Sequence, residues 1–235
     1  MPSLRWRPPP QSLLSATWDE AEGQTVRVNG IDLYYEVYGA GEPLVLLHVS
    51  LANGTFFRNQ IPVFAEHYQV IVVDIRGHGR SAFDDQPITD QLMASDTLAL
   101  LDQLKIQKVS FVGWSEGGVI ALDIAINHPE RVNKVVAYGA NYNVSGMLPD
   151  AFTNATVTAY FGQAYADYQQ LSPQPECWDA LVAELVANNA VAPDYSDEQL
   201  EAITVPFFDP GWRAGRAGRS QPDLADGAAD SERRA

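Results

Sequence analysis

The chain has 235 residues, which is long enough for one sizeable core with a small insertion. Its formal net charge of −15 disfavours binding to nucleic acid or to an anionic membrane surface, because both depend on Lys and Arg. Cys177 is the single cysteine, so the chain cannot form an internal disulfide, which fits a reducing, cytoplasmic location.

Residues 1–22 are expected to form a disordered leader, because the apolar stretch at 12–16 is too short and too polar for a signal peptide. A hairpin is predicted next. Residues 26–28 and 31–37 flank Asn29-Gly30, a pair that supplies the two positive φ angles of a type I′ turn.

Short apolar runs predict four strands that are buried on both faces, at residues 44–47, 70–73, 109–112 and 132–137. Helical patterns lie between them, at 56–66, at 92–104 with Asp90 as its cap, and at 119–126. The first of these is interrupted early by Pro62, which is tolerated only in the first turn of a helix. Such alternation predicts parallel pairing through right-handed crossovers, with ligands at the carboxyl ends of the strands. We therefore expect an α/β core over residues 23–140.

The pattern changes twice beyond this core. Residues 141–202 carry aromatic and acidic helical segments without strand signals, which predicts a helical cap over the carboxyl edge of the sheet. After Pro206 the chain becomes rich in Gly, Ala and Arg without apolar periodicity, so residues 203–235 are expected to be an aberrant, disordered tail. The strand at 132–137 would then be an uncovered sheet edge, which predicts self-association.

One motif carries chemistry. Gly113-Trp-Ser-Glu-Gly-Gly118 directly follows the strand at 109–112 and opens the next helix, which is the context of a Gly-x-Ser-x-Gly nucleophile elbow. Gly113 and Gly117 permit the tight turn, where side chains would clash. The helix N-terminus behind Ser115 stabilises an oxyanion that forms there. The motif predicts Ser115 as a nucleophile.

Further segments occur in a recognisable order along the chain. Leu46-Leu-His48 ends one strand, Asp74-Ile-Arg-Gly-His-Gly-Arg-Ser81 follows the next, and the elbow and Asn127-His-Pro-Glu-Arg-Val132 come after them. In these segments the chain resembles the α/β-hydrolase superfamily, in its branch of small esterases and lactonases. The segment 203–206 is similar to the lead-in to the family's next strand.

The resemblance implies an α/β-hydrolase fold with a mostly parallel sheet and a helical cap, here with the last strands and helices missing. It makes Ser115 the nucleophile and the backbone N–H of Glu116 one oxyanion donor, with Ser50 or Val49 supplying the second. Val49 stands where the family usually has Gly, and a β-branched residue would be strained there if the position needs a positive φ.

The resemblance also implies that a triad acid and then a triad histidine follow the serine in the chain. Asp209 lies too soon after Pro206 to be that acid, with no strand expected before it, so no triad acid or triad histidine is assigned. Structural or surface roles are expected for all four histidines, His48, His67, His78 and His128. Because a serine without a base is a poor nucleophile, we expect this apparently truncated or frame-shifted chain to be inactive or strongly impaired.

Three interpretations remain open. The first is a serine hydrolase for a small ester, lactone or similar acyl substrate, since a carboxylate nucleophile, as in dehalogenases and epoxide hydrolases, is absent from the elbow. The second is a non-catalytic protein that binds a small molecule, and the third is a non-functional gene product. No cofactor is expected, because the sequence has no metal or haem ligand cluster. Four cap aromatics either line an apolar pocket or pack the cap: Tyr160, Phe161, Tyr165 and Tyr168.

Overall fold

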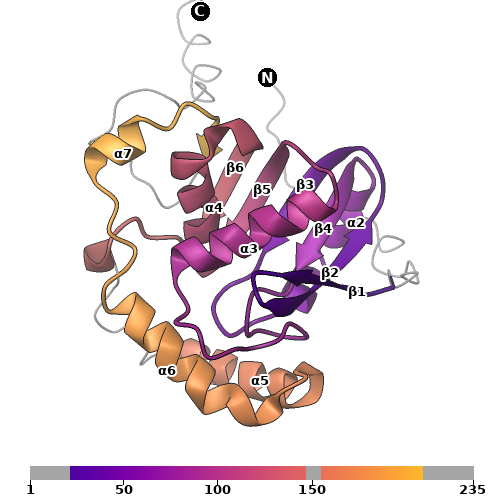
Figure 1. Cartoon of the computed structure of the whole chain (residues 1–235), viewed down its shortest axis with the longest axis vertical. Helices are drawn as coiled ribbons and strands as arrows, with labels where there is room; N and C mark the ends of the chain where they lie inside the picture. Colours follow the sequence, from indigo (N-terminus) through magenta and orange to yellow (C-terminus); the bar gives the residue numbers. More distant parts are fainter. Residues whose placement is uncertain (1–21, 147–154, 209–235) are drawn as a thin grey trace, which may run out of the picture.

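A computed structural model of the chain describes residues 22–146 and 155–208 (Figure 1). The strands are β1 (Gln24–Val28), β2 (Ile31–Tyr38), β3 (Glu42–Leu47), β4 (Tyr68–Val73), β5 (Val109–Trp114), β6 (Val132–Tyr138) and β7 (Phe207–Phe208). They form one sheet in the order β1-β2-β4-β3-β5-β6-β7. β2 pairs antiparallel with β1 and β4, and every other pair is parallel. The expected α/β fold with a mostly parallel sheet is confirmed.

The predicted hairpin forms at the start of the sheet. Val28 pairs with Ile31 across a turn in which Asn29 has φ of 40° and Gly30 has φ of 89°. Both positive φ angles that the Asn-Gly pair predicts are therefore present.

The helices between the strands are η1 (Gly54–Phe57), α2 (Ile61–Ala65), α3 (Asp90–Gln103), α4 (Glu116–Asn127) and η2 (Pro129–Arg131). Pro62 occupies the first turn of α2, where its missing N–H does no harm. The prediction that Asp90 caps α3 was wrong. Thr89 is the cap, and its hydroxyl accepts a hydrogen bond of 3.1 Å from the N–H of Leu92. Asp90 is already the first residue of α3, and its carboxylate instead accepts a hydrogen bond from Asn188 of the helical region beyond β6.

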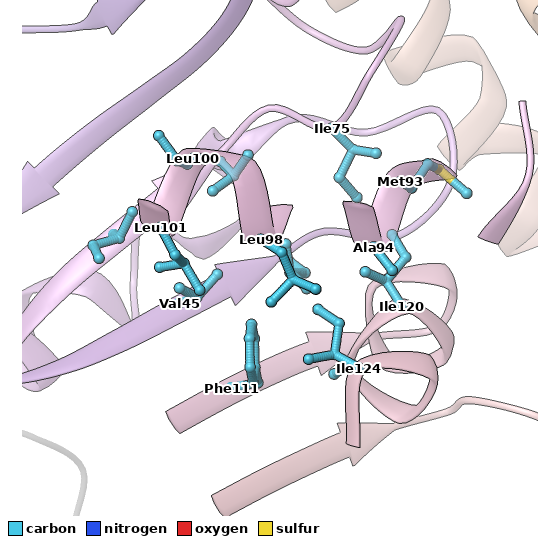
Figure 2. Close-up of a cluster of buried hydrophobic side chains, with 14 of the residues drawn as sticks. Val45, Ile75, Met93, Ala94, Leu98, Leu100, Leu101, Phe111, Ile120 and Ile124 are labelled. Atoms are coloured by element: carbon cyan, nitrogen blue, oxygen red, sulfur yellow. The ribbon is translucent and has the colours of Figure 1, made fainter. Parts of the chain in front are cut away.

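The two faces of the sheet bury different halves of β3. Leu44 and Leu46 pack with the side chains of η1 and α2 on one face. Val45 and Leu47 pack on the opposite face, against α3 and α4. Figure 2 shows this second cluster, in which Val45 and Phe111 of the sheet lie close to Leu98 of α3 and Ile124 of α4. The apolar run of β3 is continuous because both of its faces are covered.

The segment beyond β6 is helical, with η3 (Val144–Gly146), α5 (Ala155–Leu171), η4 (Pro175–Cys177), α6 (Trp178–Asn189) and α7 (Asp197–Glu201). α5 and α6 lie together at one end of the molecule, whereas α7 lies apart from them near α4 (Figure 1). α6 is tied to the segment after β4, since Asn188 donates a hydrogen bond of 2.9 Å to Asp90 and the N–H of Ile88 bonds Glu184 at 3.3 Å.

The end of the region expected to form the cap takes a different position. Tyr195 and Leu200 pack against Val119 and Leu122 on the outer face of α4. The hydroxyl of Tyr195 also donates a hydrogen bond of 2.7 Å to the buried Asp123. This part of the chain therefore covers α4 and lies away from α5 and α6.

The structure differs from the sequence-based expectation between residues 203 and 208. β7 pairs in parallel with β6, and the N–H of Val135 donates a hydrogen bond of 2.9 Å to the carbonyl of Pro206. Ile203, Val205 and Phe207 pack against the core, because they alternate with residues that point away from it. The expected disorder therefore does not extend to residues 203–208, and β7 covers the edge of β6 at Val135 and Val136. Asp209, the rest of the expected tail and residues 1–21 lie outside the described residues.

Candidate active site

Ser115 lies at the tip of the turn between β5 and α4. Its backbone has φ of 51° and ψ of −115°, an unfavourable conformation for a residue with a side chain. The N–H of Ser115 donates a hydrogen bond of 2.7 Å to the carbonyl of Tyr138, and its own carbonyl accepts bonds of 2.8 and 3.0 Å from Gly118 and Val119. Neighbouring strand and helix therefore hold the strained residue in place.

The glycines of the elbow permit very close backbone approaches. A Cβ atom at Gly113 would lie 2.2 Å from the carbonyl oxygen of Gly117. A Cβ atom at Gly117 would lie 2.1 Å from the carbonyl oxygen of Leu47, at the end of β3. Any side chain at these two positions would push the elbow away from the sheet.

The candidate oxyanion donors lie on both sides of the elbow. Glu116 is the first residue of α4, so its N–H has no acceptor within the helix and lies at the positive end of the helix dipole. The loop after β3 approaches from the other side, because the hydroxyl of Ser50 donates a hydrogen bond of 2.7 Å to the carboxylate of Glu116. The positive φ of this loop, 63°, falls on Leu51, so the strain considered for Val49 does not arise there.

Two of the four histidines are fully buried beside this loop. Nε2 of His48 accepts a hydrogen bond of 3.0 Å from the N–H of Ile75, and its Nδ1 lies 2.8 Å from the carbonyl of Val49. His78 contacts the carbonyl of Arg76 through Nδ1 at 2.8 Å. Burial lowers the pKa of His48 to about 4, and burial together with the nearby His48 ring lowers the pKa of His78 to about 3. Both rings are therefore neutral at physiological pH.

The other two histidines, His67 and His128, are exposed at the surface. His128 ends α4 and lies 3.8 Å from the carboxylate of Glu130. Within residues 22–146 and 155–208, no histidine forms a hydrogen bond with Ser115.

The loop after β4 braces the site through buried charges. Asp74 accepts hydrogen bonds from the backbone N–H groups of Gly54, at 2.6 Å, and Arg80, at 2.9 Å. The guanidinium of Arg76 is fully buried and pairs with Asp96 at 2.6 Å and with Asp84 at 2.9 Å. These contacts join the loop after β4 to the start of η1 and to the middle of α3.

The cap reaches the site through Tyr160 of α5. Its hydroxyl donates a hydrogen bond to the carbonyl of Ser50, and its ring lies 5.8 Å from that of Phe56 and 5.5 Å from that of Phe161. Tyr165 and Tyr168 instead pack on the ring of Trp178, at 5.4 and 5.3 Å. The bond from Tyr160 joins residues 110 positions apart, so no local sequence pattern indicates it.

The described residues show neither a metal site nor a membrane-spanning helix. No group of three or more His, Cys, Asp or Glu side chains in this part of the chain could hold a metal ion. None of its helices is both long enough and apolar enough to cross a bilayer.

The comparison with known families agrees with this geometry. The family model of the alpha/beta hydrolase fold matches residues 42–177, which include β3, the elbow and α5 of the cap. The chain belongs to the α/β-hydrolase family. This membership confirms the resemblance drawn from the sequence.

Curated relatives of this α/β-hydrolase chain include several hydrolases. It is 34% identical over 159 residues to a putative carbamate hydrolase, RutD, of Azorhizobium caulinodans, covering 66% of this chain and 58% of RutD. It is 36% identical over 114 residues to 3-oxoadipate enol-lactonase 2 of Acinetobacter baylyi, covering 48% of this chain and 43% of the lactonase. The chain thus spans about half the length of the curated relatives it matches.

A solved structure gives the same α/β-hydrolase fold. Est816, described as an N-acyl homoserine lactone degrading enzyme, is 29% identical, with a TM-score of 0.61 over 79% of this chain and 80% of Est816. The architecture around Ser115 is therefore that of the hydrolase fold.

Proposed function

We propose that this chain supports acyl transfer from a small ester or lactone to Ser115. The observation that carries the proposal is the strained elbow, which presents Ser115 between β5 and the N-terminus of α4. The hydroxyl oxygen attacks the substrate carbonyl and gives up its proton, the bond to the leaving oxygen breaks, and that oxygen takes up a proton. The acyl group stays on Ser115 until water hydrolyses the ester. The N–H of Glu116 stabilises the negative charge on the carbonyl oxygen.

The chemistry at the elbow and the names of relatives support the same reaction class. A serine at this position forms acyl esters, whereas a carboxylate there would favour alkyl transfer. The enol-lactonase and Est816 are both described as acting on lactones, and RutD is described as a putative carbamate hydrolase. Esters and lactones are therefore the first substrates to test.

We propose that turnover by this chain alone is low. Acyl transfer requires a base that takes the proton from Ser115, and the four histidines occupy other positions in the described structure. In another serine hydrolase fold, loss of the histidine lowers turnover by roughly a million-fold.

The test is hydrolysis of p-nitrophenyl butyrate by the purified chain, with Ser115→Ala as the control. Burst release of one p-nitrophenolate per chain, absent from Ser115→Ala, supports acylation even where later turnover is slow. Added imidazole should speed the serine-dependent rate if a base is what the site lacks. Equal rates for both proteins, with and without imidazole, would contradict acylation at Ser115.

A second candidate function is binding of a small molecule without turnover. The observation that favours it is that none of the described histidines hydrogen-bonds to Ser115. This function predicts saturable binding of a lactone or ester that survives Ser115→Ala. Loss of binding in that variant, together with a burst in the wild type, would argue for the enzyme.

A further inference from the structure

The side chain of Glu116, the residue after the nucleophile, is buried. Its Oε2 atom accepts the hydrogen bond of 2.7 Å from the hydroxyl of Ser50 and lies 3.9 Å from Nε2 of His78. Among the described residues, neither Oε1 of Glu116 nor Nε2 of His78 has a hydrogen-bond partner. A buried carboxyl with an unpaired oxygen is costly, so its position next to the nucleophile calls for a role.

Ser50 is held from two directions. Glu116 binds its side chain from α4, and Tyr160 of α5 donates a hydrogen bond to its backbone carbonyl. Its backbone N–H is a candidate for the second oxyanion donor, and that of Glu116 is the first. The position of the second donor relative to the first therefore depends on the contact between the two side chains.

We propose that Glu116 is a positioning residue for the oxyanion site, because its side chain holds Ser50 beside the N-terminus of α4. The inference rests on the proposed function, since it assigns a role in binding the anionic group that acyl transfer forms. The inference goes beyond the proposed function, because it gives the Glu116 side chain a role separate from that of the Glu116 backbone N–H.

The charge of Glu116 should then matter for anion binding. Burial is the largest cause that raises the pKa of Glu116 to about 7, the Ser50 hydroxyl opposes this shift, and the charge of Asp90 on α3 adds to it. The facing His78 is neutral and Tyr160 is uncharged, so neither compensates a carboxylate. A carboxylate beside the oxyanion site repels an anion, whereas the protonated form still accepts the Ser50 bond and can donate towards His78.

The test uses propane-1-sulfonate, a tetrahedral anion whose own charge is constant from pH 6 to pH 8. Its binding to the full chain is followed by NMR through the backbone amides of Ser50 and Glu116. Wild-type affinity should fall about tenfold from pH 6 to pH 8, as a group with a pKa near 7 loses its proton. Glu116→Gln should remove this pH dependence and keep the affinity of the wild type at pH 6.

Two further variants separate positioning from general damage. Glu116→Leu cannot accept the Ser50 bond, so it should bind the sulfonate more weakly than Glu116→Gln at both pH values. Glu130→Gln, an exposed carboxyl near His128, should behave as the wild type. Amide spectra of each variant report whether it is folded.

The proposal is overturned if folded wild type does not bind the sulfonate at pH 6. It is also overturned if binding is independent of pH, or if the Leu and Gln variants bind alike. These outcomes differ from failure of the proposed function. A chain that shows the expected sulfonate pattern but no burst with p-nitrophenyl butyrate retains the positioning role of Glu116 and lacks acyl transfer.

Discussion

The backbone N–H of Ile75 donates a hydrogen bond of 3.0 Å to Nε2 of His48. Nε2 must therefore be unprotonated, which leaves the ring proton on Nδ1, where the carbonyl of Val49 accepts it at 2.8 Å. Nε2 joins the end of β3 to the segment after β4, whereas Nδ1 makes a local contact within the loop after β3. His48 thus acts as a structural link that is neutral at physiological pH, because its pKa in the folded chain is about 4.

The two buried histidines make stability depend on pH. Their pKa values in the folded chain, about 4 for His48 and about 3 for His78, lie below the ordinary value of 6.5. Unfolded histidines therefore bind protons first as the pH falls from about 6.5 towards 4, and the stability of the folded state is lost in that window. Each histidine contributes a slope of about 1.4 kcal/mol per pH unit there.

Glu116 acts in the opposite direction, since its raised pKa makes the folded chain bind a proton more readily between about 4.5 and 7. In urea unfolding, the free energy of unfolding of Glu116→Gln should therefore fall more steeply from pH 7 to pH 5 than that of the wild type. If the free energy of unfolding of Glu116→Gln does not fall from pH 7 to pH 5, the assignment of His48 and His78 as neutral in the folded chain is contradicted.

The contact between Asn188 and Asp90 should stabilise the docking of the cap. Both side chains are buried, and their hydrogen bond is 2.9 Å long. Asn188→Ala leaves the Asp90 carboxyl without this donor, so it should cost about 1–3 kcal/mol in the free energy of unfolding. The neighbouring Asn189→Ala should change it by less than about 0.5 kcal/mol.

A double-mutant cycle isolates the pair itself. In an Asp90→Ala background, Asn188→Ala should cost less than in the wild type, because the carboxyl that it would leave unpaired is gone. Strictly additive effects would show that the two residues stabilise the chain independently.

The backbone strain at Ser115 should be measurable as a difference in stability between two variants of this residue. Ser115 has φ of 51°, which glycine adopts more readily than any residue with a Cβ atom. Ser115→Gly should therefore be more stable than Ser115→Ala by about 1 kcal/mol, although both lack the hydroxyl. Thermal unfolding of the two variants checks this, and a lower melting temperature for the glycine variant would rule out strain as the deciding effect.

The buried guanidinium of Arg76 should be among the most sensitive positions. Arg76→Met leaves Asp96, which is also buried, without its partner and should cost about 3–5 kcal/mol. Adding Asp96→Asn should recover part of this loss, since it removes the stranded charge. Arg27→Met is the matched control, because Arg27 and Asp32 form an exposed pair and little change is expected. Equal destabilisation by both arginine variants would refute this account.

The sheet and the elbow could be predicted because their signals are local. Each central strand is a short apolar run, the hairpin is marked by Asn29-Gly30, and Ser115 lies in a motif of six residues between a strand and a helix. The short strand β7 was missed because the alternation of Ile203, Val205 and Phe207 is brief and directly precedes a stretch rich in Gly and Arg.

The contacts around the nucleophile could not be predicted in the same way. Ser50 and Glu116 are 66 positions apart, and Ser50 and Tyr160 are 110 positions apart. Residue spacing cannot indicate such pairs, because the tertiary fold alone brings them together. The N-cap residue of α3 was predicted wrongly for a related reason. Thr89 and Asp90 are both good N-cap residues, and the distant Asn188 donates a hydrogen bond to Asp90.

The bonds that fasten the cap also bear on the order in which the chain folds. They join Phe83 to Gln174, Ile88 to Glu184 and Asp90 to Asn188, across separations of 91, 96 and 98 residues. Closing loops of this length costs more conformational entropy than closing a short loop. The hairpin of β1 and β2 closes over only two residues, so it can form earlier. The cap should therefore dock after the sheet has assembled and be the first part to detach, with α5 and α6 exchanging their amide hydrogens before β3 and β5 do.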